Sequence, residues 1–267
     1  MTTRTRRLLR ERILVEGMKG SSKSYQWLML ARFLLKRGDG VSFRVIDTDN
    51  AIERMLESEF PDLIPEEGGN VYIYPVYEWP EYVEAKNILL REAQQGDWNV
   101  IDMADNAWKA VQSYFVSEVY KKDIGDYFLQ ARIDLRAKGD KTAKGKEAKN
   151  LQPMKGWIDW PVVNKLYDDF MLPLVYRSKA HLYMTAGVSV VSRDDDEDTR
   201  GLYGPFGVKP TGQKNLAHQV HTEFLFQQGD RQGKWEITTI KDRGRRYYDH
   251  APLLDLPKQY FIGVVGW

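Results

Sequence analysis

Residues 17–24, GMKGSSKS, combine small residues with lysine and serine in an order that could bind phosphate. The pattern G-x-x-x-x-G-K-[ST] forms a loop in which the lysine reaches the phosphates and the next hydroxyl binds Mg²⁺. Lys23 and Ser24 occupy these two positions, but Ser22 stands where the second glycine is usual. The stretch predicts a nucleotide site with one departure, and its candidate contact residues are Gly17, Met18, Lys19, Gly20, Ser21, Ser22, Lys23, Ser24 and Tyr25.

Two later stretches, VIDTDN and NVIDMADN, place aspartates directly after short apolar runs. Asp102, in the second stretch, follows the phosphate-binding pattern by roughly 80 residues, and ATPases of this kind hold the Mg²⁺ shell with such a carboxylate. The alternative is an aspartate that merely ends a strand. We favour a metal role for Asp102 together with Ser24.

The elements around these residues alternate between strand and helix. Apolar runs predict strands at 12–16, 41–47, 70–77 and 98–105, and the proline in the third indicates either a sheet edge or a strand end. Helical spacing predicts helices at 24–36, 50–60 and 80–95. This alternation predicts an α/β fold with a mostly parallel sheet flanked by helices.

The second half of the chain departs from the simple alternation. Helices are predicted at 106–122 and 161–177, with an aromatic stripe in the first that we interpret as packing, and a strand at 180–191. Residues 218–228 and 234–244 alternate like antiparallel strands. We predict a basic N-terminal tail at 1–11 and a single domain at 12–267, with a helical, lysine-rich insertion at about 106–180.

The composition narrows the class of protein. The 267 residues suffice for one large domain, and no apolar run approaches the roughly 18 residues that a membrane helix needs. The absence of cysteine excludes disulfides, thiolate zinc sites and a cysteine nucleophile. We therefore expect a cytoplasmic protein with no membrane partner. The net charge is only +1, so any contact with nucleic acid must come from local basic patches.

The order of the patterns resembles the core of the RecA superfamily over roughly residues 12–247. The phosphate-binding stretch is followed by FRVIDTDNA, NVIDMADNA, HLYMTAGVSVV, a glycine-containing loop, NLAHQVHTEFLF and TTIKDRGR. The resemblance implies a RecA-like P-loop NTPase fold, ATP and Mg²⁺ as cofactors, and a homo-oligomeric ring or filament with ATP at the subunit boundaries. Small phage-encoded RecA-like or RadA-like ATPases, associated with single-strand annealing and recombination, are the most similar group.

The resemblance also implies catalytic roles for individual residues beside Lys23. Asp49 lies where RecA proteins carry a glutamate that orients the attacking water, and it is the shorter side chain. Thr185 corresponds to the polar residue that senses the γ-phosphate. Lys241 and Arg243, in IKDRG, correspond to basic residues that reach the ATP of the adjacent subunit.

Several basic residues could hold the backbone of a DNA single strand, because lysine and arginine pair with phosphates. The candidates are Lys138, Lys141, Lys144, Lys146, Arg193, Arg200 and Lys209. Residues 191–213 correspond to the mobile DNA loop of RecA, but the acidic run DDDED at 194–198 argues against a simple transfer of that role. His218 and His221 are interpreted as packed or surface histidines rather than metal ligands.

These patterns together predict an ATPase, stimulated by DNA, that acts on single-stranded DNA in recombination or strand annealing. The expected partners are single-stranded DNA and further copies of the chain, with a single-strand binding protein as another candidate. A helicase or packaging motor with the same core is one alternative. A nucleotide-gated DNA-binding scaffold with little hydrolysis is the other, because Ser22 and Asp49 both depart from the usual pattern.

Overall fold

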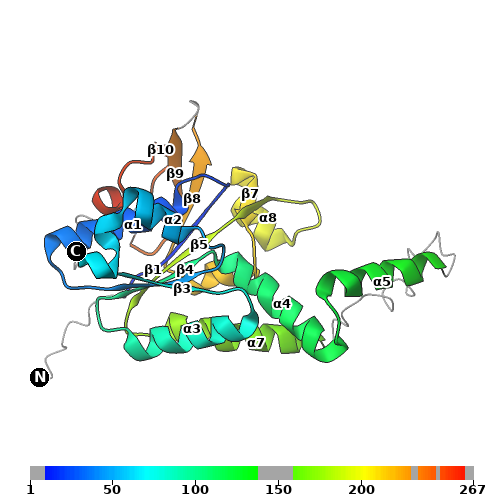
Figure 1. Ribbon diagram of the computed structural model, residues 1–267. Coiled ribbons are helices and arrows are strands. Elements are labelled where there is room, and N and C mark those ends of the chain that lie inside the picture. The colour runs from blue at the N-terminus through cyan, green and yellow to red at the C-terminus, as the bar shows by residue number, and fades with distance from the viewer. Residues whose placement is uncertain (1–9, 138–158, 230–233, 245–246, 262–267) are drawn as a thin grey trace, which may run out of the picture.

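A single eight-stranded sheet forms the centre of the protein (Figure 1). The computed structural model describes residues 10–137, 159–229, 234–244 and 247–261. The strand order is β10-β9-β8-β1-β5-β4-β2-β3, in which the six strands from β8 to β3 are parallel and β9 runs antiparallel to β8. The predicted fold class, a mostly parallel α/β sheet flanked by helices with antiparallel strands near the C-terminus, is confirmed.

The strands of this sheet lie close to the predicted ranges, except β10, for which no strand was predicted. They are β1 (Arg12–Gly17), β2 (Phe43–Asp47), β3 (Val71–Pro75), β4 (Trp98–Asp102), β5 (His181–Ala186), β8 (Thr222–Gln228), β9 (Trp235–Asp242) and β10 (Ala251–Pro252). The two remaining strands, β6 (Val188–Val190) and β7 (Val208–Pro210), form a separate antiparallel pair. β3 is an edge strand, as its proline predicts.

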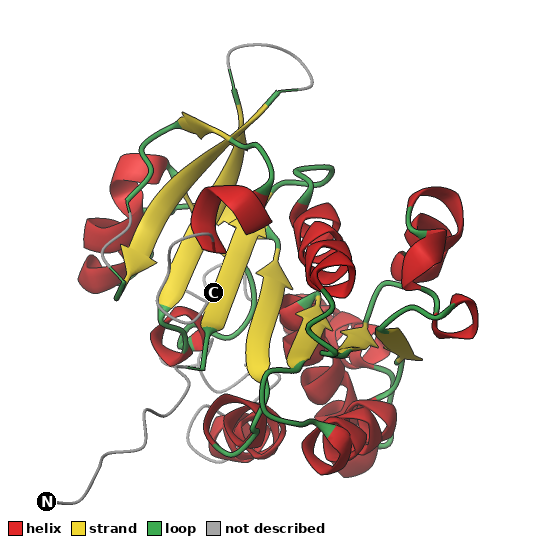
Figure 2. Ribbon diagram, turned by 90° about the vertical axis from the view of Figure 1, so that its left-hand side faces the viewer, coloured by secondary structure: helices red, strands yellow, loops and turns green. Residues whose placement is uncertain are grey.

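Helices cover both faces of the sheet, as Figures 1 and 2 show. The α-helices are α1 (Lys23–Arg37), α2 (Ile52–Glu59), α3 (Trp79–Glu92), α4 (Ala104–Tyr120), α5 (Ile124–Ala137), α7 (Asp159–Tyr176) and α8 (Glu197–Tyr203). Short 3₁₀ turns occupy Pro61–Leu63, Pro65–Glu67, Gly204–Phe206 and Leu216–Gln219, and a π-turn occupies Pro257–Phe261. α1 and α2 lie on one face, and α3, α4 and α7 lie on the other.

β1 shows why the central strands read as continuous apolar runs. Ile13 and Val15 pack on the face covered by α1, whereas Leu14 packs on the face covered by α3 and α4, and all three are fully buried. A parallel strand with helices on both sides has no solvated face, so its apolar residues do not alternate with polar ones. Parallel pairing also brings the carboxyl ends of β1, β2, β4 and β5 to one edge of the sheet.

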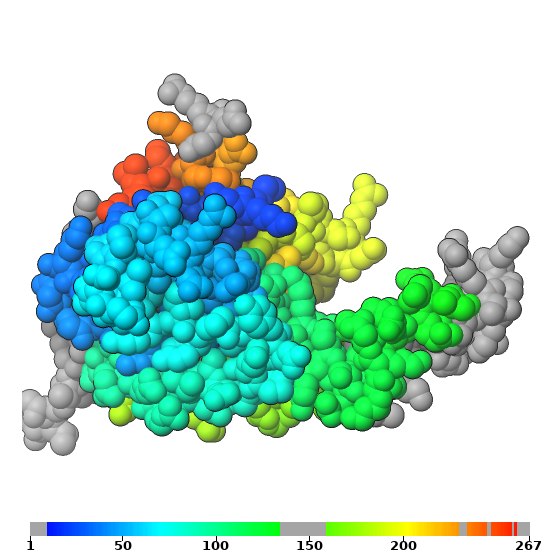
Figure 3. All heavy atoms as spheres, viewed as in Figure 1, coloured from blue at the N-terminus to red at the C-terminus, as the bar shows by residue number. Residues whose placement is uncertain are grey.

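The two ends of the predicted insertion belong to the packed body. α4 and α7 pack against each other and against α3, and Trp108 stacks near Trp160 and Tyr167. The aromatic stripe at 106–122 therefore serves packing. α5 stands away from the body beyond α4 in Figure 3. Residues 138–158, with the predicted lysine-rich loop, lie outside the described residues.

Residues 188–210 form a small lobe with regular secondary structure, within the stretch that the resemblance matches to a mobile DNA loop. β6 pairs with β7, and α8 is inserted between these strands. The acidic run shapes this lobe, because Asp196 accepts a hydrogen bond from the Thr199 N–H at 2.8 Å and so caps α8. A 3₁₀ turn at Leu216–Gln219 lies between β7 and β8.

The basic tail predicted at 1–11 is anchored at its end. The Arg10 guanidinium donates to the Val175 carbonyl at 2.6 Å and to the carbonyls of Leu174 and Ala180. These groups lie at the end of α7 or just beyond it, where carbonyls lack intrahelical partners. Arg10 therefore closes the C-terminal end of α7, while residues 1–9 lie outside the described part of the chain.

Two buried carboxyl groups, Glu16 and Glu223, lie on neighbouring strands of the helix-covered sheet. Both side chains are fully buried, and neither oxygen of Glu16 has a hydrogen-bond partner. The Tyr203 hydroxyl donates to Glu223 at 2.6 Å. Burial raises the pKa of Glu16 well above its ordinary value, and the neighbouring Glu223 raises it further. The pair therefore favours a state that holds at least one proton.

We predict that Glu16→Gln stabilises the protein at alkaline pH. A carboxyl group whose pKa is raised by folding contributes most stability below about pH 4.5 and loses it as the pH rises towards the folded pKa. Glutamine stays neutral in the same volume, and each unit of pKa shift removed is worth about 1.4 kcal/mol. Urea unfolding at pH 5 and pH 8 should show a smaller loss of stability for the variant than for the wild type. The exposed Glu84→Gln is the control, and an unchanged pH dependence in Glu16→Gln would contradict the prediction.

Candidate nucleotide-binding site

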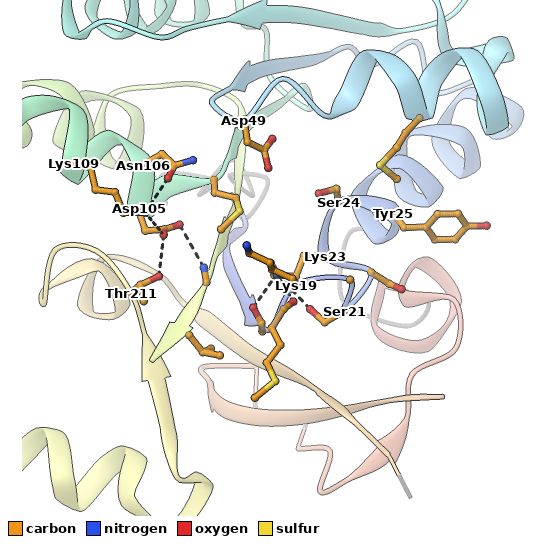
Figure 4. Close-up of a pocket in the computed structure, with 18 residues that line it drawn as sticks. Lys19, Ser21, Lys23, Ser24, Tyr25, Asp49, Asp105, Asn106, Lys109 and Thr211 are labelled. Atoms are coloured by element: carbon orange, nitrogen blue, oxygen red, sulfur yellow. Dashed lines mark hydrogen bonds and ion pairs between the residues drawn. The ribbon is translucent and has the colours of Figure 1, made fainter. Parts of the chain in front are cut away.

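A cavity of about 940 Å³ opens at the carboxyl ends of the parallel strands (Figure 4). Its wall includes all nine residues of the predicted phosphate loop. The other lining residues are Asp49, Met55, Met103, Asp105, Asn106, Lys109, Gly187, Val188 and Thr211. The carboxyl edge of a parallel sheet is where α/β proteins bind ligands, so the position and size suit a nucleotide.

Two positions in the loop between β1 and α1, Gly17 and Ser22, show how close contacts and backbone conformation limit the residue type. A Cβ atom on Gly17 would lie 2.6 Å from the Phe226 carbonyl oxygen, so only glycine fits there. Ser22 has φ 65° and ψ 18°, which is the left-handed region. A residue with a side chain is strained in that region by roughly 1–2 kcal/mol. The glycine that the pattern expects at this position would avoid the strain.

The N-terminus of α1 is open towards the cavity. Its first turn contains no acidic residue, and the Ser22 side chain makes no capping hydrogen bond. The free N–H groups and the positive end of the helix dipole are therefore available to an anion. Beside them, the Lys23 ammonium donates to the carbonyls of Gly17 at 2.8 Å and Met18 at 2.9 Å.

Burial and nearby acids act in opposite directions on the pKa of Lys23. Burial lowers the pKa of Lys23, while Asp102, Asp105 and Asp49 act in the opposite direction. Its two carbonyl partners belong to the loop itself, and they compensate the ammonium only in part. An anionic phosphate would be a stronger partner for this ammonium than the carbonyl groups.

Asp102 is a fully buried carboxylate behind the loop. Trp27, on α1, donates its indole N–H to Oδ2 at 2.8 Å, and the Thr185 hydroxyl donates to Oδ1. Burial raises the pKa of Asp102, while Thr185, Trp27 and Ser24 lower it by hydrogen bonding. The hydroxyl of Ser24 and this carboxylate are hard oxygen ligands, and with phosphate oxygens and waters they fit the needs of Mg²⁺.

Asp49 extends from the turn after β2 into the cavity, as Figure 4 shows. The neighbouring Asp47 fixes this turn, because its carboxylate accepts the backbone N–H groups of Asp49 and Ile52 at 3.3 and 3.2 Å. Burial raises the pKa of Asp49 to about 6, and the charges of Asp102 and Asp47 contribute. A carboxyl group with such a pKa can accept a proton near neutral pH.

Asp105 is a cavity residue to which the sequence patterns gave no role. It lies in the first turn of α4 and accepts a hydrogen bond from Thr211 Oγ1 at 2.9 Å, and Lys109 Nζ lies 3.5 Å from the same oxygen (Figure 4). Its other oxygen faces the Gly187 N–H at 3.4 Å. Asp105 thus holds the β6–β7 lobe against the cavity. The sequence does show a second aspartate three residues after Asp102. Its role could not be predicted, because the residues that it contacts are distant in the sequence.

Three of the predicted catalytic residues lie away from the cavity wall. Thr185 is fully buried against Asp102, so its hydroxyl would reach a nucleotide only through that carboxylate. Lys241 and Arg243 lie at the other end of the sheet, where Asp242 pairs with Thr222 and Thr222 pairs with Ile13. That is roughly 13 Å along β1 from the phosphate loop. These two residues cannot serve the nucleotide site of their own chain.

The described DNA candidates differ in their availability. Arg193 and Arg200 are exposed on the lobe at 188–210. Lys209 is instead paired with Asp195, so its charge is neutralised within the lobe. Lys138, Lys141, Lys144 and Lys146 lie outside the described residues. Of the helices that the structure describes, none has the length and apolarity to cross a membrane.

No protein-family model matches the sequence, and no curated protein matches it. Among solved structures, the crystal structure of the RadB recombinase is similar over 89% of this chain and 83% of that chain. The TM-score is 0.49 and the sequence identity is 14%. A similarity this low assigns no residue role and no activity to the chain.

We predict that Ser22→Gly stabilises the protein by up to about 1 kcal/mol, because glycine adopts the left-handed region without strain. ATP affinity should not fall, since no hydrogen bond from the Ser22 side chain caps α1. Urea unfolding and nucleotide titration measure the two effects. Ser22→Ala is the matched control, because it removes the hydroxyl but keeps Cβ. A gain of equal size in Ser22→Ala would show that strain at Cβ is not the cause.

Proposed function

We propose that the protein binds ATP with Mg²⁺ in this cavity, hydrolyses it, and acts as a homo-oligomer on single-stranded DNA in recombination or strand annealing. The observation that carries the nucleotide site is the convergence of Lys23 and the open N-terminus of α1 beside the Ser24 and Asp102 oxygens. A positive loop and a hard-oxygen pair at one sheet edge suit a triphosphate with its metal.

Several residues in and around the cavity have a proposed role in this reaction. Lys23 and the loop N–H groups bind the phosphates, and Ser24 and Asp102 hold Mg²⁺, which neutralises phosphate charge when it is bound. Asp49 orients the attacking water and accepts its proton, supported by its place on the cavity wall and its pKa of about 6. The remaining contribution is cationic and comes from Lys241 and Arg243 of an adjacent copy, since those of the same chain lie too far away.

The proposed DNA role is supported by exposed arginines close to the nucleotide cavity. The lobe at 188–210 exposes Arg193 and Arg200 and touches the nucleotide cavity through Thr211 and Asp105. A strand bound on this lobe would therefore lie close to the nucleotide. The lysines at 138–146 are further candidates for contacts to the DNA backbone, and the resemblance to small phage-encoded ATPases supports annealing over translocation.

A nucleotide-gated scaffold with little hydrolysis is the second candidate function. Two observations favour it. Ser22 strains the loop that must close on the phosphates. Asp49 is one methylene shorter than the usual glutamate, so water must lie closer to the turn after β2. Such a protein would bind ATP and DNA with normal affinity but turn ATP over slowly.

ATP binding and turnover, with and without a single-stranded oligonucleotide, test the proposed function. Lys23→Ala should lose ATP binding, because it removes the ammonium that lies on the loop beside the open N-terminus of α1. Asp49→Asn should keep binding and lose turnover by about 10²-fold or more, because it cannot accept a proton. Asp39→Asn, at the end of α1, should behave like the wild type.

A wild type that neither binds ATP nor responds to DNA would refute the proposal, and tight binding without turnover would favour the scaffold.

Arg243→Ala tests whether catalysis crosses a subunit boundary. The variant should bind ATP like the wild type, because its own cavity is intact, but hydrolyse it at least 10²-fold more slowly. When the variant is titrated into the wild type, turnover should fall in proportion to the boundaries that lack Arg243. Normal hydrolysis by Arg243→Ala alone would show that this arginine does not act on a nucleotide.

A further inference from the structure

Four side chains gather at the end of the sheet opposite the phosphate loop. They are Arg12 at the start of β1, His221 just before β8, and Lys241 and Arg243 at the end of β9, and we call them the sheet-end cluster. A β-bulge between β8 and β9 leaves Ile240 without a partner in the register and sets Lys241 opposite Glu223. Of these four residues, the resemblance implied a catalytic role only for Lys241 and Arg243.

Arg12 is held in place by His221 and Tyr176. Its Nε lies 3.2 Å from His221 Nε2, and Nη2 approaches the same ring nitrogen. The guanidinium also lies 5.4 Å from the centre of the Tyr176 ring. A planar group that is already held on two sides loses little further conformational freedom when it binds a ligand. Tyr176 also forms a side-chain hydrogen bond with the guanidinium.

The charge of the sheet-end cluster is strongly positive. Burial lowers the pKa of His221 to about 4, and Arg12, Arg243 and Lys241 contribute. His221 is therefore a neutral acceptor for Arg12 at physiological pH. Arg12, Lys241 and Arg243 form no ion pair with a carboxylate within the part of the chain that the structure describes.

Two carboxyl groups near the sheet-end cluster do not neutralise it. Glu223 faces Lys241 from β8 but accepts the Tyr203 hydroxyl, and burial raises its pKa. Asp242 accepts the Gly244 N–H at 2.7 Å and the Thr222 hydroxyl at 3.1 Å, on the other side of β9. Lys241 itself is positioned by the Ala217 carbonyl at 2.9 Å. Three cations thus surround one neutral histidine, and the arrangement suits a multiply charged anion.

We propose that Arg12 is a phosphate-binding residue of the sheet-end cluster, acting with Lys241 and Arg243 on the triphosphate of a nucleotide bound to a neighbouring copy of the chain. This inference rests on the proposed function. Arginine presents a rigid fork of N–H groups that matches phosphate oxygens, and Arg12 presents it already oriented. His221 is the positioning residue, because it fixes the guanidinium without adding charge. The compact grouping of the three cations favours one triphosphate over an extended strand.

A complementation experiment tests this inference. Arg12→Ala keeps an intact nucleotide cavity but lacks the cation, whereas Lys23→Ala keeps the cation but lacks the cavity's lysine. Each variant alone should hydrolyse ATP at least 10²-fold more slowly than the wild type. An equal mixture should recover activity towards about a quarter of the wild-type rate, since that share of head-to-tail boundaries joins two intact halves. Arg91→Ala, an exposed arginine outside both sites, is the control and should have no effect.

Further variants separate the role of Arg12 from a merely structural one. Arg12→Lys keeps the charge but not the fork, so it should fold like the wild type, bind ATP normally and recover only part of the turnover. Full wild-type turnover in Arg12→Ala, or a mixture that regains nothing although both variants fold and associate, would overturn the inference while the proposed function stands. Loss of oligonucleotide binding with unchanged turnover would instead assign the cluster to DNA. If wild-type protein does not hydrolyse ATP, both ideas fail together.

Discussion

A single buried carboxylate, Asp102, sets the geometry on which the proposed nucleotide site depends. A charge without access to water needs several donors, and here they come from Trp27 on α1 and Thr185 on β5. These bonds tie the helix that follows the phosphate loop to the two strands beside it. The loop, Ser24 and Asp102 therefore keep a fixed relation before any ligand arrives, which is the condition for binding a metal and a phosphate together.

The two ends of the parallel sheet have opposite chemical character. At the carboxyl end, three aspartates surround one lysine, so a phosphate bound there would need a cation beside it. At the amino end, three cations surround a neutral histidine. Parallel pairing brings the carboxyl ends of β1, β2, β4 and β5 to the cavity edge, whereas the antiparallel β9 ends at the opposite edge. The β6–β7 lobe, fixed by Asp105 and Thr211, closes the acidic end on one side.

The sequence predicts the elements well where the local pattern is strong. The strands at β1, β2 and β4 are apolar runs with an aspartate or glycine at the end, so both their existence and their functional ends could be recognised. The lobe at 188–210 could not be recognised in this way, because its glycines and prolines indicate a loop. Its structure depends on pairing between Val188 and Pro210, which are distant in the sequence. The role of Asp105 depends on Thr211, 106 residues further along the chain. The direction of the Thr185 side chain likewise depends on contacts that no periodicity reveals.

The strand β1 joins the phosphate loop to Arg12, and this has a consequence for assembly. If one copy's cations serve another copy's nucleotide, the contact joins two different surfaces and is heterologous. Copies then add head to tail, and the assembly has a direction. In an open filament, the copy at one end would hold a nucleotide with no neighbouring cations opposite it. In a closed ring, every nucleotide would face the cations of a neighbouring copy. Activity per chain would therefore rise with length in short filaments and be constant in rings, so the geometry of one strand makes assembly size a kinetic variable.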